Sequence, residues 1–158
     1  MFALAQQEPP AEPMITRGIF RVYSSHAIVL LDTGASHSFV AATFAHALGI
    51  DVSPLDLFLR VETPVAGFSS LTQVCKGCEL RVTDVFDGRE FVSTFDLIVL
   101  EMRGFDIILG MDWLTSCQAM IDCHQRKVIL TTPEESKIRF FTNRCEGQEL
   151  LLLKDQRK

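Results

Sequence analysis

The most informative segment of this sequence is Ala27-Ile28-Val29-Leu30-Leu31-Asp32-Thr33-Gly34-Ala35-Ser36. Its five consecutive apolar residues, with Val and Ile among them, are typical of a β-strand that is covered on both faces. The Asp-Thr-Gly that follows has the composition of a tight turn. The segment therefore places a carboxylate at the point where a buried strand ends.

A carboxylate in such a position is costly to ionise when it is isolated. Asp32 therefore either accepts hydrogen bonds from Thr33, Ser36 and nearby amides, or has a raised proton affinity. Both arrangements make it a candidate acid or base, and Gly34 lets a second backbone approach it closely. Taken alone, however, the tripeptide favours an ordinary turn or a helix cap, because Asp and Gly are common turn residues.

Length and composition narrow the class of protein. A chain of 158 residues that is 47% hydrophobic is long enough for one domain with a real core. The net charge of -5, without any basic run, argues against nucleic acid as a partner. No apolar run approaches the roughly 18 residues that span a membrane. We therefore expect neither a nucleic acid nor a membrane as a partner of this chain.

The N-terminus lacks both the basic start and the long apolar core of a signal peptide, which predicts a reducing, cytoplasmic location. Cysteines in such a compartment are expected to be free thiols, and an odd number of them fits a disulfide framework poorly. The expected free thiols are Cys75, Cys78, Cys117, Cys123 and Cys145.

Composition also divides the chain into three parts. Residues 1–13 are polar and Pro-rich, which predicts a flexible linker or tail. The folded domain is expected over residues 14–141. The apolar pattern weakens after that, so residues 142–158 are predicted to form a C-terminal tail that is disordered or forms an interface.

Many short strands at regular spacing, two short helices and frequent turn signals predict an all-β, barrel-like domain. The predicted strands cover residues 15–23, 27–32, 54–59, 78–83, 91–95, 96–100, 106–110, 119–123, 128–132 and 138–141. One predicted helix has its apolar residues within 39–48 and ends at Gly49, and the other covers 111–116. Residues 60–70 are expected to form a hairpin whose tip contains Pro64 and Gly67.

A second segment, residues 105–114 (Phe-Asp-Ile-Ile-Leu-Gly-Met-Asp-Trp-Leu), is an apolar strand that ends in Gly and enters a helix. The order of Asp-Thr-Gly-Ala, hairpin, and Ile-Leu-Gly before a helix resembles the retropepsin-type aspartic proteases. Together with residues 31–39 (Leu-Asp-Thr-Gly-Ala-Ser-His-Ser-Phe) and 121–128 (Ile-Asp-Cys-His-Gln-Arg-Lys-Val), it resembles the protease domain of plant Ty3/Gypsy-type retrotransposon polyproteins. The resemblance covers about residues 14–133.

This resemblance implies a closed barrel of the retropepsin (acid protease) type in which Asp32 is the catalytic carboxylate. Thr33 would hydrogen-bond across a dimer interface, and Gly34 would contact the substrate backbone. The hairpin over residues 61–70 would be the flap that covers the substrate, and Ile-Leu-Gly at 108–110 would support the active-site turn from behind. The implied substrate-binding residues are Ala35, Thr63, Pro64, Val65, Ala66, Gly67, Phe68 and Ile108.

The chemistry of peptide hydrolysis by this route needs two carboxylates that share one proton around a water molecule. Two such close charges cannot both ionise, so the pair titrates as a unit. This sequence contains a single Asp-Thr-Gly. An active enzyme must therefore be a homodimer in which Asp32 faces its twin across a two-fold axis.

The expected function is an aspartic endopeptidase, without a metal or cofactor, that cuts an extended polypeptide. Its natural substrate would be the retrotransposon polyprotein that contains it, in the cytoplasm or within virus-like particles. The alternative is a catalytically silent relic or a domesticated domain that binds peptides or self-associates, because the fold does not require an active pair of carboxylates.

Several other residues have both a functional and a structural interpretation. Cys75 and Cys78 have the spacing of zinc ligands, and Cys123 with His124 could complete a zinc site. The second half has no paired Cys-x-x-Cys or His-x₃-His, however, so buried thiols are favoured. His37 is a candidate base, although a turn residue is the simpler interpretation. Asp112 is either a second acid or a favourable charge at a helix start. Trp113 is expected to pack in the core or at an interface.

Overall fold

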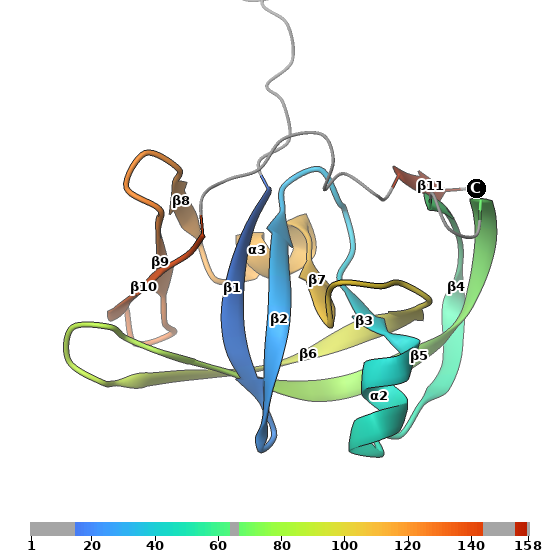
Figure 1. Ribbon diagram of the computed structural model, residues 1–158, viewed down its shortest axis with the longest axis horizontal. Helices are drawn as coiled ribbons and strands as arrows, with labels where there is room; N and C mark the ends of the chain where they lie inside the picture. Colours follow the sequence, from blue (N-terminus) through green and yellow to red (C-terminus); the bar gives the residue numbers. More distant parts are fainter. Residues whose placement is uncertain (1–14, 64–66, 144–153, 158) are drawn as a thin grey trace, which may run out of the picture.

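The computed structural model describes residues 15–63, 67–143 and 154–157 (Figure 1). The strands are β1 (Ile15–Val22), β2 (Ser25–Asp32), β3 (Phe39–Ala41), β4 (Ser53–Thr63), β5 (Gly67–Thr83), β6 (Glu90–Leu100), β7 (Ile107–Leu109), β8 (Met120–Asp122), β9 (Lys127–Thr131), β10 (Lys137–Phe141) and β11 (Lys154–Arg157). The helices are α2 (Ala42–Leu48) and α3 (Met111–Ser116).

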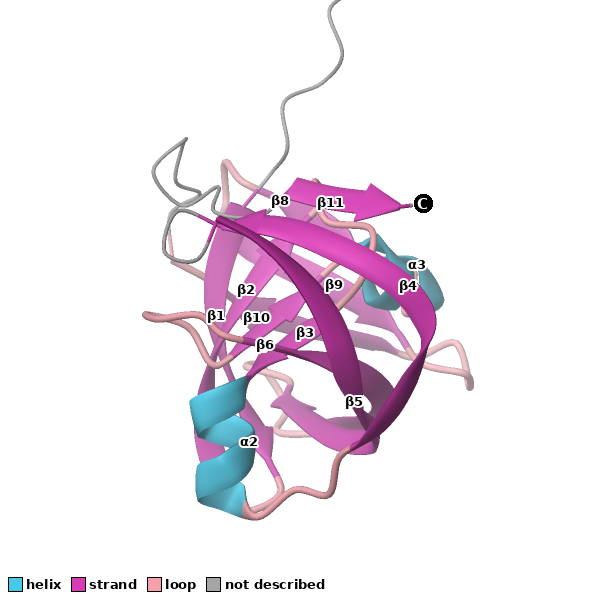
Figure 2. Ribbon diagram, turned by 90° about the vertical axis from the view of Figure 1, so that its right-hand side faces the viewer, coloured by secondary structure: helices cyan, strands magenta, loops and turns pink. Residues whose placement is uncertain are grey.

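Eight strands form one sheet in the order β1-β2-β7-β3-β6-β5-β4-β11. Strand β1 also pairs with β5, through Arg21 with Arg81 and Val22 with Leu80, so the sheet closes on itself. Figure 2 shows the strands curving around a common interior. The predicted all-β, closed fold with two short helices is confirmed.

Strand β2 pairs on both edges within this ring, antiparallel to β1 and parallel to β7. Side chains that alternate along it enter two separate hydrophobic clusters: Val29 and Leu31 belong to one, and Leu30 to the other. All three are at most 2% exposed. This double burial explains the apolar run from Val29 to Leu31 and confirms the prediction of a strand covered on both faces for that part, whereas Ile28 is 39% exposed.

The predicted helix over residues 39–48 is too long at its start. Phe39, Val40 and Ala41 form strand β3, which pairs in parallel with β6 and antiparallel with β7, and all three are buried. Pairing on both edges outweighs a helical spacing of apolar residues, which is a weak local preference. Helix α2 begins only at Ala42, and Gly49 caps its end with a φ of 68° as predicted.

Strands β5 and β6 are each longer than the sequence predicts. Strand β5 runs for 17 residues from Gly67 to Thr83 because a β-bulge between Cys75 and Cys78 bends it without ending it. Gly77 adopts a φ of 63° in this bulge, and its N–H donates to Asp96 Oδ1 at 2.8 Å. The two strands predicted at 91–95 and 96–100 are likewise one strand, β6.

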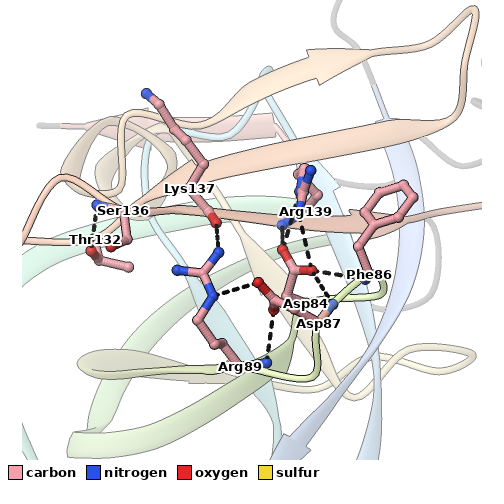
Figure 3. A network of polar contacts seen from close by, with 8 residues as sticks. All are labelled: Asp84, Phe86, Asp87, Arg89, Thr132, Ser136, Lys137 and Arg139. Carbon is pink, nitrogen blue, oxygen red and sulfur yellow. Dashed lines mark hydrogen bonds and ion pairs between the residues drawn. The ribbon is translucent and has the colours of Figure 1, made fainter.

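Strands β8, β9 and β10 form a separate antiparallel sheet, which confirms the predicted hairpin and edge strand. This sheet packs on the ring through the cluster that Val128, Leu130, Ile138 and Phe140 share with β2. A polar link is Asp84, a buried carboxylate just after β5 that the sequence did not suggest (Figure 3). Asp84 Oδ2 accepts hydrogen bonds from the backbone N–H and the Nε of Arg139 in β10, at 2.8 and 3.2 Å. Its Oδ1 accepts the N–H groups of Phe86 and Asp87.

The environment of Asp84 favours its charged form. Burial by itself raises the pKa of this carboxyl, but the hydrogen bonds from Arg139, Phe86 and Asp87 outweigh burial. The pKa therefore lies well below the usual range of an aspartate. Asp84 is an ionised tie between the end of β5 and β10.

The cysteines only partly match the expectation of five free thiols. Cys75, Cys78 and Cys117 are free and buried, and burial raises the pKa of Cys78 to about 12 and that of Cys117 to about 11. Cys123, however, is disulfide-bonded, so the prediction is wrong at this position. Cys123 follows β8 and is only half-buried, which makes its sulfur reachable where the other three are enclosed. Cys145 lies outside the described residues.

Among the described residues, none of the helices is long and apolar enough to cross a membrane.

Candidate active site

The candidate site is built on the turn that ends β2. Asp32 is the last residue of that strand and is 2% exposed. Its Oδ1 accepts the N–H of Gly34 at 2.8 Å, and its backbone carbonyl accepts the N–H of Ala35 at 3.2 Å. Of the two arrangements that the sequence left open, hydrogen bonding to nearby amides is therefore present.

Close backbone packing holds the turn in place from behind. Gly110 follows β7, and a Cβ atom at this position would lie 2.4 Å from the carbonyl oxygen of His37 and 2.6 Å from that of Ala35. The N–H of Met111 donates to the same Ala35 oxygen at 2.7 Å. The Ile-Leu-Gly segment therefore supports the turn through direct backbone contact at Gly110, and only glycine leaves room for that contact.

Ser38 and Asp112 add a polar tie between the same two segments. Ser38 is 1% exposed, and its Oγ accepts the N–H of Gly110 at 3.0 Å while it donates to Asp112 Oδ1 at 2.7 Å. Asp112 Oδ1 also accepts the N–H of Trp113 at 2.7 Å. Asp112 therefore positions the turn through Ser38. The sequence analysis did not select Ser38. Its position four residues after Gly34, close to the candidate acid Asp32, was a signal that could have identified it.

Strand β7 places Ile108 next to the strand that carries Asp32. Leu30 and Ile108 are register partners in the parallel β2–β7 pair. Ile108 is 3% exposed and packs in the same hydrophobic cluster as Ala35, Leu59 and Val61. Two expected substrate-binding residues, Ala35 and Ile108, are thus brought together beneath the turn.

The expected flap is a hairpin of β4 and β5, which pair from Leu59 with Leu71 to Thr63 with Gly67. Leu59 and Val61 are fully buried and anchor this hairpin in the cluster that contains Ala35. The turn after β2 and the paired ends of β4 and β5 lie on the same side of the ring (Figure 1). The hairpin is therefore placed where it can cover the turn.

The end of the hairpin carries the remaining expected substrate-binding residues. Gly67 has a φ of 66° and opens β5, and the Phe68 side chain is 49% exposed. The guanidinium carbon of Arg60 lies 4.6 Å from the centre of the Phe68 ring. Thr63 ends β4. The expected residues Pro64, Val65 and Ala66 lie outside the described residues.

Two cavities flank the turn. One, of about 540 Å³, includes His37 together with Leu55, Asp56 and Leu57 at the start of β4. The other, of about 350 Å³, lies beside Thr33 and is lined otherwise by α3 and the residues that follow it: Met111, Leu114, Thr115, Gln118, Ala119 and Ile121. Thr33 thus faces an apolar recess, whereas His37 faces a more polar one.

The contacts of the other candidates, His37 and Trp113, indicate structural roles. His37 Nδ1 lies 3.1 Å from Ser36 Oγ in an exposed part of the turn. Trp113 is fully buried, with its ring centre 5.8 Å from that of Phe20 and its Nε1 donating to Ser93 Oγ, which assigns it to the core. Within the described part of the chain, no group of three His, Cys, Asp or Glu side chains is arranged to hold a metal ion.

A closed β-ring with a buried Asp32 that starts an Asp-Thr-Gly turn, a hairpin on the same side and a supporting Gly defines the class of aspartic-protease-like folds. The family model of the retroviral aspartyl proteases matches residues 1–136. The chain belongs to this family.

Solved structures give a likeness of fold. The retroviral protease-like domain of Ddi1 from Leishmania major superposes with a TM-score of 0.52 at 16% sequence identity, over 86% of this chain and 96% of that domain. A search of curated proteins finds no match. The structural neighbour therefore supports the retropepsin-like fold.

Proposed function

We propose that this chain is an aspartic endopeptidase that acts as a homodimer. The observation that carries the proposal is the position of Asp32, which is buried at the end of β2 and held by the Gly34 N–H. Membership of the retroviral aspartyl protease family supports the same assignment.

The proposed mechanism uses one Asp32 from each copy. One carboxylate takes a proton from a water molecule as that water attacks the scissile carbonyl carbon, and the other carboxyl donates its proton to the carbonyl oxygen. The sequence contains a single Asp-Thr-Gly, so one chain supplies only half of this pair. The protein is therefore proposed to be inactive as a monomer.

The other expected site residues receive roles that fit their positions. Thr33, beside the apolar recess at α3, is proposed to bond to its counterpart in the second copy. Gly34 is exposed and is proposed to contact the substrate backbone, with Ala35 and Ile108 forming the floor below it. The flap residues from Thr63 to Phe68 are proposed to cover an extended polypeptide.

The proposed natural substrate is a polyprotein of the plant Ty3/Gypsy type, in which residues 14–141 form the protease domain between a linker and a C-terminal tail. This rests on the similarity of residues 31–39, 105–114 and 121–128 to such polyproteins.

The test is cleavage of an unstructured protein substrate from acid to neutral pH at several enzyme concentrations. Activity is expected to peak at acid pH, to rise faster than linearly with concentration, and to vanish in Asp32→Asn. Asp51→Asn removes an exposed carboxylate just after α2 and should retain full activity. If the folded wild-type protein cuts nothing at any concentration, the chain is instead a silent member of the family that binds peptides or self-associates.

A further inference from the structure

A groove of about 510 Å³ lies away from the candidate active site, along β1 and β2 and between the far end of β5 and β10. It shares no lining residue with the two cavities that flank the Asp32 turn. In Figure 1, β10 and the turn between β5 and β6 lie together to the left of β1. The groove is thus a separate surface feature.

Bulky apolar side chains stand exposed along this groove. Ile19 is 68% exposed and Ile28, its register partner in β2, is 39% exposed. Across the groove, Val85 is 47% exposed and Phe141 is 55% exposed. The Phe141 ring also packs against the Phe86 ring, with 6.1 Å between the two ring centres. Apolar surface that gathers around a groove is typical of a binding site.

Among the residues that the structure describes, the ionisable side chains that line the groove are all basic: Arg17, Arg21, His26 and Arg81. Two of these charges are already balanced. Arg81 forms ion pairs with Glu90 at 3.0 Å and with Glu79 at 3.2 Å, and Arg21 lies 3.7 Å from Glu90. The uncompensated charge of the groove is therefore concentrated at Arg17.

One donor of the Arg17 guanidinium, its Nε, lacks an acceptor within the described part of the chain. The guanidinium carbon lies 5.8 Å from the centre of the Phe105 ring, and the Nε is buried. A buried donor of a charged group that makes no hydrogen bond costs free energy. A carboxylate is the natural partner, since it accepts two parallel N–H groups of a guanidinium.

We propose that this groove binds an extended polypeptide segment in which a carboxylate side chain lies between bulky apolar side chains. The carboxylate pairs with Arg17, and the apolar side chains cover Ile19, Ile28 and Phe141. Nucleic acid fits the groove less well, because a phosphate backbone needs several uncompensated cations and Arg21 and Arg81 are paired. The site is independent of cleavage at Asp32.

The test is fluorescence anisotropy with a labelled short peptide in which glutamates alternate with phenylalanine and leucine. The peptide is titrated with the wild-type protein, Asp32→Asn, Arg17→Gln, Ile19→Ser and the matched charge control Arg103→Gln. Arg103 is exposed and does not line the groove. A second peptide carries glutamine in place of each glutamate, and thermal unfolding checks that each variant is folded.

We expect the acidic peptide to bind the wild-type, Asp32→Asn and Arg103→Gln proteins equally, and both Arg17→Gln and Ile19→Ser to bind about tenfold more weakly. The glutamine peptide should show a similar loss with the wild-type protein. Equal binding of the two peptides, no effect of Arg17→Gln, or loss of binding in Asp32→Asn would overturn the proposal. Self-association of the wild-type protein that Ile19→Ser abolishes would also overturn it, in favour of a second copy as the occupant.

Discussion

The absence of a Cβ atom at Gly110 allows the turn that carries Asp32 to pack against the segment after β7. Gly110 touches the backbone of that turn, with carbonyl oxygens 2.4 and 2.6 Å from where a Cβ would lie. The atoms that it would meet belong to backbone, which cannot rotate away as the end of a side chain can. The need for glycine here comes from close approach and not from an unusual φ.

We therefore expect Gly110→Ala to destabilise the protein by at least about 2 kcal/mol, because overpacking a tight contact forces the backbone to shift. Urea unfolding monitored by Trp113 fluorescence measures the change. The control is Gly18→Ala in β1, where a Cβ would meet its nearest atom, of Phe140, at 3.5 Å. That change should lie within about 1 kcal/mol of wild type. An equal loss for both variants would contradict the role given to Gly110.

Ser38 and Asp112 are expected to act as one unit. Ser38→Ala leaves the buried N–H of Gly110 without its acceptor and should cost about 1–3 kcal/mol of unfolding free energy. Asp112→Asn in the Ser38→Ala background should cost less than in wild type, because the bond between them is already lost. A double-mutant cycle by urea unfolding measures the coupling. Ser116→Ala is the control, because it removes a hydroxyl that bonds to the Trp113 carbonyl within α3 and to Cys117 Sγ. Additive effects would show that the two side chains act separately.

At the scale of elements, Asp84 is the charged member of the contacts that tie the end of β5 to β10, beside the backbone bond from the Val85 N–H to the Arg139 carbonyl. Asp84 accepts hydrogen bonds from β10 and from its own turn, and these hold its pKa well below the usual range. A group whose pKa is lowered in the folded state contributes stability above its unfolded pKa of about 4. That contribution is lost as pH falls through the lower, folded pKa.

Asp84→Asn is accordingly expected to lower the unfolding free energy by about 2 kcal/mol at neutral pH, since hydrogen bonds to a charged group are lost. The difference between wild type and variant should persist down to about pH 4 and shrink below it. Urea unfolding at a series of pH values measures this difference. Asp122→Asn serves as the control, because Asp122 is exposed and accepts one backbone hydrogen bond, from Gln125. A difference between wild type and Asp84→Asn that does not change with pH would contradict the assigned charge.

At the scale of the whole molecule, the proposed homodimer requires an apolar surface next to Thr33. Met111 is 42% exposed and lines the recess that Thr33 also lines. If two copies meet there, Met111→Glu should weaken self-association by at least about tenfold, because it places a charge in an apolar contact. Sedimentation equilibrium measures the change. Val52→Glu alters a side chain of similar exposure, 43%, outside this recess and should leave self-association unchanged. Equal effects of Met111→Glu and Val52→Glu on self-association would show that the dimer interface does not lie at this recess.

Much of the fold could be predicted from local patterns. The double burial of β2, the Gly49 cap and the hairpin of β8 and β9 follow from residues that are neighbours in sequence. The errors in the helix over residues 39–48 and in β5 involve residues whose partners are distant in the sequence. Phe39 to Ala41 looks helical until β6 and β7 pair with it, and the two halves of β5 look separate until the bulge at Gly77 joins them.

By itself the sequence determined the all-β class, the buried strand that ends in Asp32, and the likeness to retropepsins, because apolar runs, turn residues and ordered motifs are properties of the chain. Only the tertiary structure decided the partners of that strand. It brought Gly110 against Ala35 and joined Ser38 to Asp112 across 74 positions. It also left Arg17 in a basic, apolar groove. These contacts arise from the closure of the sheet, which joins segments that no local pattern relates.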